Sequence, residues 1–126
     1  MILGIGIDIV SVHRISHIVE KWGRRFIQRI LTRHEMEAMP TSGQRLWEYL
    51  AGRFAAKEAF LKAIGTGVSH GVGFKDVWIV NGPSGRPDLF FSPAIEQLFS
   101  DRPIKQVHVS LSHERQLAIA MVVLEG

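Results

Sequence analysis

The sequence of 126 residues contains no cysteine. This absence excludes a disulfide framework, a thiolate metal site and a cysteine nucleophile, and it fits a reducing compartment. No apolar run approaches the roughly 18 to 20 residues that a membrane helix needs, and the N-terminus lacks the basic-then-apolar layout of a signal peptide. We therefore expect a cytoplasmic protein that is neither exported nor embedded in a membrane.

An excess of one charge sign is also nearly absent, since 15 Lys and Arg face 12 Asp and Glu, a formal net charge of +3. Hydrophobic residues make up 46% of the chain and charged residues 21%, the balance of an ordinary globular protein. The length predicts a single domain over residues 1–126. The small positive excess favours an anionic partner without choosing among nucleic acid, a phosphorylated metabolite and an acidic protein.

The hydrophobic pattern predicts an α+β protein with the element order β-α-α-α-β-β-α-β-β. Helices are expected to begin at Val12, near Thr32, at Gln44 and at Pro93. The predicted strands cover residues 2–10, 74–80, 87–91, 105–112 and 117–124. The last of these is apolar on both faces, so it is either a central strand or one covered by another subunit.

Asp8 interrupts the first apolar strand, and a lone buried carboxylate costs several kcal/mol unless it is paired or bound to a cation. Gly4 and Gly6 precede it on the same face, which leaves room for another backbone or a ligand to approach. One interpretation is a hydrogen-bonded structural aspartate at the end of a strand. The other is a carboxylate that faces a ligand.

Glu58 lies in the predicted third helix, with Lys62 one turn later. Taken alone, this spacing is typical of a solvent-facing ion pair worth about 0.3–0.5 kcal/mol. However, one carboxylate from a strand and one from a helix also suit Mg²⁺, which usually takes one or two protein carboxylates together with substrate phosphates. Lys62 on the same face would neutralise a phosphate beside the metal. The residues alone leave both interpretations open.

Residues 110–114 gather two hydroxyls and an imidazole, those of Ser110, Ser112 and His113, where we expect a turn between the last two strands. A Ser-His nucleophile is disfavoured, because no oxyanion arrangement or orienting third group is evident. These donors suit a phosphate-binding turn better. The alternative is a polar end of a hairpin.

Other signals are weaker. The glycine-rich segments 65–67 and 71–73 match neither a Walker A loop nor a dinucleotide fingerprint. The remaining histidines are interpreted as surface or core residues without metal-ligand spacing: His13, His17, His34, His70 and His108. Five basic residues form either a solvated face or a surface for an acidic helix of a partner: Arg14, Lys21, Arg24, Arg25 and Arg29.

Three segments, taken together in order and spacing, resemble the bacterial holo-[acyl-carrier-protein] synthases, the small class of phosphopantetheinyl transferases. They are GIGIDIV at residues 4–10, RFAAKEAF at residues 53–60 running on to GTG at residues 65–67, and SLSH at residues 110–113. The resemblance covers the whole chain. It implies a 4'-phosphopantetheinyl transferase-like fold, in which an antiparallel sheet is packed with helices.

The resemblance implies transfer of 4'-phosphopantetheine from coenzyme A to a serine of apo-acyl-carrier protein, a reaction of fatty acid biosynthesis that releases adenosine 3',5'-bisphosphate. Asp8 and Glu58 match the family's Mg²⁺ ligands and, with Lys62, form the implied catalytic group. The implied coenzyme A site comprises Arg53, Lys62, Ser112 and His113. The implied carrier-protein contacts are Arg14 and Arg24. The family also implies a homotrimer with the active site between neighbouring subunits.

The expected chemistry is an in-line displacement at the β-phosphorus of coenzyme A, driven by positioning and charge neutralisation. The serine proton passes either to Glu58 or through a metal-bound water. Two alternative functions remain. One is a metal-dependent phosphohydrolase using the same two carboxylates, and the other is a small basic nucleic-acid-binding module, which would need exposed aromatics interleaved with Lys and Arg.

Overall fold

The computed structural model describes residues 1–65 and 71–126. The strands are β1 (Ile2–Ser11), β2 (Val77–Asn81), β3 (Pro87–Phe91), β4 (Gln106–His113) and β5 (Leu117–Glu125). The α-helices are α1 (Val12–Trp22), α2 (Arg24–Ile30), α3 (Arg33–Glu37), α4 (Gly43–Ile64) and α5 (Pro93–Asp101). A short 3-10 helix, η2, covers Phe74–Asp76. The α+β class predicted from the sequence is confirmed.

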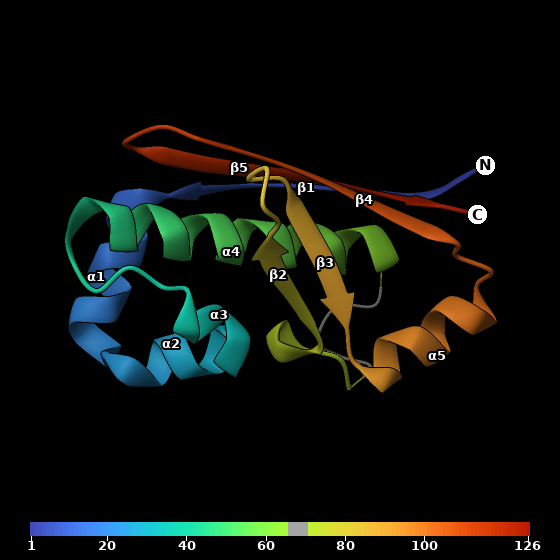
Figure 1. Cartoon of the computed structure of the whole chain (residues 1–126), viewed down its shortest axis with the longest axis horizontal. Coiled ribbons are helices and arrows are strands. Elements are labelled where there is room, and N and C mark those ends of the chain that lie inside the picture. The colour runs from blue at the N-terminus through green and yellow to red at the C-terminus, as the bar shows by residue number, and fades with distance from the viewer. Residues whose placement is uncertain (66–70) are drawn as a thin grey trace.

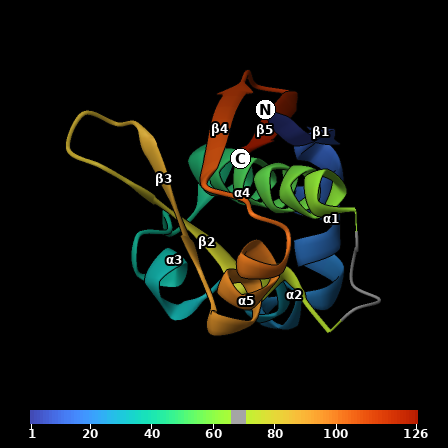
Figure 2. The same ribbon diagram turned by 90° about the vertical axis from the view of Figure 1, so that its right-hand side faces the viewer.

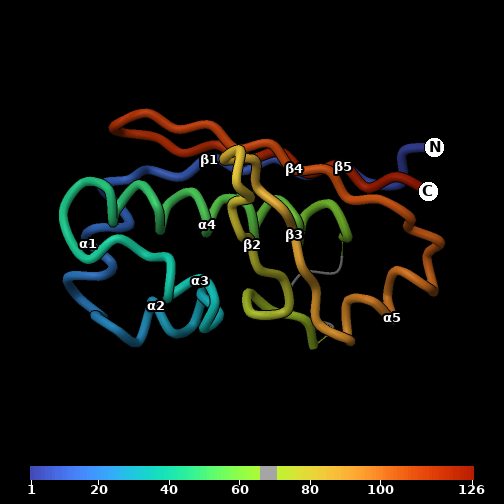
Figure 3. The backbone as a smooth tube through the Cα atoms, viewed as in Figure 1, coloured from blue at the N-terminus to red at the C-terminus, as the bar shows by residue number. Residues whose placement is uncertain are grey.

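Among the described residues the strands form two antiparallel sheets, one with the order β1-β5-β4 and the other made of β2 and β3. The three-stranded sheet lies along one side of α4 and the helices α2, α3 and α5 lie on its other side, whereas the β2–β3 hairpin crosses beside α4 and reaches the level of the sheet (Figure 1). β5 is the central strand, as one of the two interpretations of its apolar sequence required. The two termini lie side by side (Figure 3), where the Met1 ammonium donates a 2.9 Å hydrogen bond to the Gly126 carbonyl.

Helix α4 packs directly on β1 because two glycines of that strand lack side chains. A Cβ atom at Gly6 would lie 1.8 Å from the Ala59 carbonyl oxygen, and one at Gly4 would lie 2.3 Å from that of Ala63. The space that the sequence left to a backbone or a ligand is therefore filled by the backbone of α4. Despite its length, neither α4 nor any other helix in the described part of the chain is apolar enough to cross a membrane.

The face of the three-stranded sheet that points away from α4 is apolar and open. Ile5, Ile7 and Ile9 of β1 are 60%, 57% and 59% exposed, and Leu117, Ile119 and Met121 of β5 are exposed beside them. The register places Ile7 opposite Met121 and Ile9 opposite Ile119, so these side chains form a continuous strip. A strip of this size on a sheet is a feature of surfaces that another protein chain covers.

The structure differs from the predicted element order in two places. In the described part of the chain four α-helices precede β2 instead of three, because Gly23, with a φ of 60°, separates α1 from α2 within the stretch read as one helical pattern. The second strand, β2, begins later than predicted, since residues 74–76 form η2 and the strand starts at Val77. The predicted glycine end of α4 holds at Gly65, whose φ is 73°, whereas Thr66 and Gly67 lie outside the described residues.

A buried ion pair joins the parts of the fold below α4. The Lys57 ammonium lies 2.5 Å from the Glu35 carboxylate and donates a second hydrogen bond to the carbonyl of Ile30. Glu35 also accepts from the backbone N–H groups of Thr32 and Ile79. One pair of charges thus ties α4 to the end of α2, to α3 and to β2.

Candidate functional site

Asp8, Glu58 and Lys62 come together where β1 crosses the C-terminal half of α4. Lys62 donates a 2.9 Å hydrogen bond to the Asp8 carboxylate and a 3.1 Å hydrogen bond to the Ile7 carbonyl. The Lys62 side chain is 53% exposed and that of Asp8 16% exposed, so the pair lies at the protein surface and not in the core. The close packing allowed by Gly4 and Gly6 is what brings this turn of α4 to Asp8.

Two of these groups, Glu58 and Lys62, have shifted pKa values. The pKa of Glu58 is raised, first by partial burial and then by the negative charge of Asp8, while Lys62 opposes the shift. The pKa of Lys62 is raised, chiefly by its hydrogen bond to Asp8. The carboxylates are therefore near enough to repel, and a cation between them would relieve that repulsion. The hydrogen bonds of Lys62 go to β1, which distinguishes this arrangement from an isolated surface pair with Glu58.

A second group of predicted residues lies in a cavity of about 230 Å³ on the other side of α4. Arg53, Ser112 and His113 line it, together with Arg45 and Tyr49. Asp8 aligns through Ala120 of β5 with Leu111 of β4, so the two groups sit at opposite edge strands of one sheet. Figure 2 shows β4 and β1 at the two edges of the sheet, with β5 between them. The structure therefore brings the predicted residues together as two clusters and not as one.

Arg53 is buried in this cavity and packs against Tyr49, with a donor left for an anion. The residue is 7% exposed, and its guanidinium carbon lies 4.4 Å from the ring centroid of Tyr49. Tyr49 is fixed in turn by a 2.6 Å hydrogen bond from its hydroxyl to the Glu35 carbonyl. Within residues 1–65 and 71–126, the Arg53 Nε–H is buried and has no hydrogen-bond acceptor. Such a buried donor is satisfied when a ligand oxygen binds.

The segment read as a turn between the last two strands is part of a strand. Ser110, Ser112 and His113 all belong to β4, and the chain reverses at residues 114–116. Because side chains alternate along a strand, the Ser112 and His113 side chains leave β4 on opposite faces, at the edge next to the Arg53 cavity. A phosphate-binding turn is therefore not formed by these residues.

The basic residues of the first two helices line two separate cavities. One, of about 460 Å³, is formed by Ile18, Trp22, Arg25, Phe26 and Arg29. The other contains Arg24 and lies between α2 and α3. Arg14 is exposed on α1. Trp22 at the end of α1 and Phe26 in α2 line the first cavity, although neither was among the predicted site residues.

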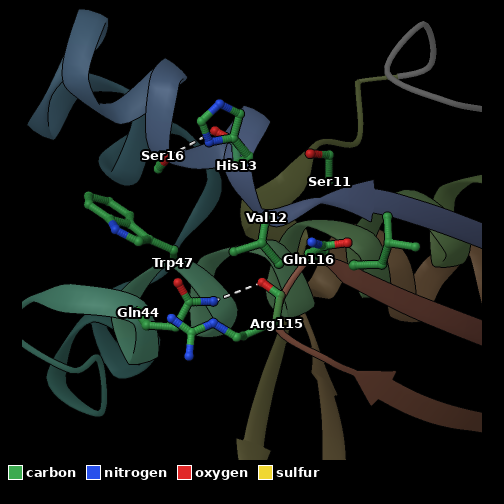
Figure 4. Close-up of a pocket in the computed structure, with 9 residues that line it drawn as sticks. Ser11, Val12, His13, Ser16, Gln44, Trp47, Arg115 and Gln116 are labelled. Atoms are coloured by element: carbon green, nitrogen blue, oxygen red, sulfur yellow. Dashed lines mark hydrogen bonds between the residues drawn. The ribbon is translucent and has the colours of Figure 1, made fainter.

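A cavity of about 550 Å³ lies away from all the catalytic residues predicted from the sequence. Figure 4 shows its walls, which come from the start of α1, the start of α4 and the turn between β4 and β5. Trp47, Gln44 and Arg115 line it, and Gln44 donates a 2.8 Å hydrogen bond to the Arg115 carbonyl. Cavity size therefore does not identify the site at which the titratable groups gather.

The sequence and the fold match known proteins over their full length. Residues 4–122 match the model of the 4'-phosphopantetheinyl transferase superfamily. The holo-[acyl-carrier-protein] synthase of Halothermothrix orenii is 47% identical over 125 residues, which cover 99% of this chain and 98% of that protein.

Two solved structures are similar in fold as well as in sequence. The crystal structure of holo-[acyl-carrier-protein] synthase from Neisseria meningitidis is 43% identical, with a TM-score of 0.92 and complete coverage of both chains. The Bacillus anthracis enzyme in complex with CoA (3',5'-ADP) is 42% identical, with a TM-score of 0.82 over 98% of this chain and 96% of that one. The chain therefore belongs to the 4'-phosphopantetheinyl transferase superfamily and, within it, to the holo-[acyl-carrier-protein] synthases.

Proposed function

We propose that this enzyme transfers 4'-phosphopantetheine from coenzyme A to a serine of apo-acyl-carrier protein and releases adenosine 3',5'-bisphosphate. Family membership supports the reaction, and the Bacillus anthracis relative has been solved with CoA (3',5'-ADP). The single observation that carries the assignment is the convergence of Asp8, Glu58 and Lys62 from two elements 50 residues apart at one surface site. We also propose that the enzyme acts in the cytoplasm.

Asp8 and Glu58 are the residues that would hold a Mg²⁺ ion. The fit is chemical: both are hard oxygen donors, and the pKa of Glu58 is raised first by partial burial and then by the negative charge of Asp8. No group of three or more His, Asp or Glu side chains in the described residues is arranged for a metal, which suits an ion that takes few protein ligands. When bound, Mg²⁺ supplies positive charge to the pyrophosphate oxygens of the substrate.

The remaining steps belong to the side chains. Lys62, more than half exposed, is free to turn from Asp8 toward a pyrophosphate oxygen and to offset charge that builds on the leaving group. Glu58 is the proton acceptor that we favour for the carrier serine, because its raised pKa makes it a stronger base than an ordinary surface glutamate. Neutralising the carboxylate of Asp8 or of Glu58 would therefore weaken both the binding of the cation and the transfer of the serine proton.

Arg53 and its neighbours provide the second half of the coenzyme A site. The unpartnered Arg53 Nε–H, with Arg45 and His113 around the same cavity, suits a phosphate group of the nucleotide. Ser112 adds a hydroxyl at the rim. Because α4 separates this cavity from Asp8, we propose that one coenzyme A molecule contacts Asp8, Glu58 and Lys62 of one subunit and the Arg53 cavity of another.

The open strip on the sheet supports the same arrangement. Three isoleucines more than half exposed on one strand are costly in water, and burying them against further copies of the chain would recover that free energy. We propose the homotrimer that the family implies. Ile7→Glu should leave a folded monomer in light scattering with less than a tenth of the activity, whereas an active Ile7→Glu monomer would contradict a shared site.

The carrier protein is the second substrate, and the basic side of α1 and α2 is the surface we assign to it. Arg14 and Arg24 are exposed there, and the nearby cavity combines Trp22 and Phe26 with Arg25 and Arg29. An acidic amphipathic helix would place its carboxylates on the arginines and an apolar side chain against Trp22. Charge reversal at Arg14 should raise the KM for the carrier more than the KM for coenzyme A.

Intact-mass analysis of apo-acyl-carrier protein, after incubation with coenzyme A in the presence and absence of Mg²⁺, tests the proposal. We expect the carrier to gain the mass of phosphopantetheine only when the cation is present. Free phosphopantetheine beside an unmodified carrier would instead indicate the phosphohydrolase. Binding to nucleic acid that ignores Mg²⁺ and weakens steeply with salt would indicate the nucleic-acid-binding module.

A further inference from the structure

His13 and His17 face each other on the exposed side of α1. Their Nε2 atoms are 2.9 Å apart, and the ring centroids are 4.3 Å apart at an interplanar angle of 84°. Residues four apart on a helix share a face, so these two imidazoles can reach the same point although no group of three or more metal-ligating side chains occurs among the described residues. Neither residue belongs to the site of Asp8 and Glu58 or to the Arg53 cavity.

The surroundings of His17 favour a free lone pair on Nε2, the ring nitrogen that faces His13. The carboxylate of Glu20 lies 4.0 Å from His17 Nδ1, on the side of the ring away from His13. A nearby anion favours the tautomer with the proton on Nδ1, and this leaves Nε2 as an acceptor or a metal ligand. Ser16 donates a 2.7 Å hydrogen bond to the His13 carbonyl, which holds the first turn of the helix that carries the pair.

The separation of the two nitrogens matches a shared metal ion. Two imidazole nitrogens at about 2.0–2.1 Å from one ion and at a right angle to each other are about 2.9 Å apart, whereas tetrahedral ligation separates them by about 3.3–3.4 Å. The observed 2.9 Å therefore fits the right-angled geometry. Ions with square-planar or octahedral preference and affinity for imidazole are Cu²⁺ and Ni²⁺.

We propose that His13 and His17 form a binding site for a divalent transition-metal ion of this class, with Glu20 positioning the His17 ring. The other coordination positions would hold water, because the His17 and Glu20 side chains are 62% and 67% exposed. His13 also lines the cavity in Figure 4. The site is chemically distinct from the Asp8–Glu58 site, since hard Mg²⁺ prefers carboxylate oxygens to imidazole.

The test uses the full-length protein and Cu²⁺ as its chloride, with Mg²⁺ as the comparison ion. Titration calorimetry should show one Cu²⁺ per chain, and the visible absorption band of bound Cu²⁺ should report nitrogen ligation. Removing even an outer partner of a metal ligand costs about 10–100-fold in affinity, so His13→Gln and His17→Gln should each weaken binding by at least about 100-fold. Glu20→Gln should weaken it by about tenfold.

His34→Gln is the matched control, because His34 is a histidine of another helix that stacks on Trp78 and stands outside the pair. Cu²⁺ should raise the Tm of the wild type and of His34→Gln but not that of the two single variants, as an ion that binds only the folded helix stabilises it. Circular dichroism without metal checks that all variants fold. Equal Cu²⁺ affinity in His17→Gln and wild type would overturn the proposal and leave the 2.9 Å contact as a hydrogen bond only.

Discussion

Two lysines of α4 pair with carboxylates, and the two pairs behave in opposite ways. Lys57 and Glu35 are 2.5 Å apart with neither side chain exposed, whereas Lys62 and Asp8 are 2.9 Å apart with 53% and 16% of their side chains exposed. Five residues of helix turn through about 140° beyond a full turn, so the lysines point into different surroundings. One pair is enclosed by the fold, and the other is available to a ligand.

The environments also shift the two lysines in opposite directions. Burial is the largest influence on Lys57 and lowers its pKa, although Glu35 opposes the shift. The hydrogen bond to Asp8 is the largest influence on Lys62 and raises its pKa. A buried charge pair must keep both partners, because a single remaining charge has no water to solvate it. An exposed pair can exchange its partner for a substrate phosphate at little cost.

The largest effect should follow from breaking the enclosed pair. Lys57→Met leaves the Glu35 carboxylate buried without its cation, and this should destabilise the protein by about 3–5 kcal/mol. Urea unfolding followed by circular dichroism measures the change. The double variant Lys57→Met/Glu35→Gln should recover a large part of that loss, because the glutamine amide keeps an acceptor oxygen and carries no charge. A loss below about 1 kcal/mol in the single variant would mean that the pair is not structural.

The exposed pair should govern activity instead of stability. Asp8→Asn keeps the size of the side chain but removes its charge, and the rate of holo-carrier formation should fall by about 100-fold or more. Intact-mass measurement of the carrier over time provides the rate. The urea midpoint is the control and should move little. Near-normal turnover by a folded Asp8→Asn protein would remove this residue from the mechanism.

The two lysines are compared most directly by the same substitution, to methionine, at Lys57 and at Lys62. Lys62→Met removes an exposed ion pair, and such pairs contribute at most about 1 kcal/mol, so its stability should stay close to that of the wild type. Its transfer activity should nonetheless fall, while Lys57→Met loses stability first. Unfolding curves and rates of the two variants, measured side by side, check the contrast. Equal losses of stability in Lys62→Met and Lys57→Met would show that the exposure of an ion pair does not determine how much it contributes to the stability of this protein.

The sequence predicted the exposed cluster better than the enclosed pair, and the reason is physical. Asp8 was visible because a charge within an apolar strand needs compensation, and Glu58 and Lys62 were visible because four residues make one helical turn. Glu35 was visible only as half of a capping box with Thr32, which the structure confirms. Its second partner, Lys57, is 22 positions away, and no periodicity links residues across a tertiary contact.

The glycines of β1 show the same limit. Gly4 and Gly6 predicted a close approach from the sequence, and the structure identifies the approaching group as the backbone of α4. Arg53 lies against Tyr49, four residues earlier on α4, and the hydrogen bond that fixes Tyr49 goes to the Glu35 carbonyl of α3, a contact that only the folded chain makes. Local patterns thus predicted candidate residues, but not that α4 divides them into two clusters.

The smallest expected effect concerns the cost of the exposed cluster to the fold. The pKa of Glu58 is raised in the folded protein, first by burial, so the folded state holds the proton of this group more tightly than the unfolded state. The contribution of Glu58 to stability therefore falls as the pH rises from the unfolded value of 4.5 through the raised folded value, and it stays reduced at neutral pH. Glu58→Gln removes this penalty because the amide is neutral at every pH.

Without Mg²⁺, Glu58→Gln should therefore have a slightly higher Tm than the wild type at about pH 7.5, and the difference should shrink toward zero at about pH 4. Calorimetric scans of both proteins at the two pH values provide the measurement, and transfer activity should be lost in the variant at both. A gain in Tm together with a loss of activity is typical of substitutions at active-site residues. A variant less stable than the wild type at the higher pH would instead place Glu58 with Lys57, among the charges that hold the fold together.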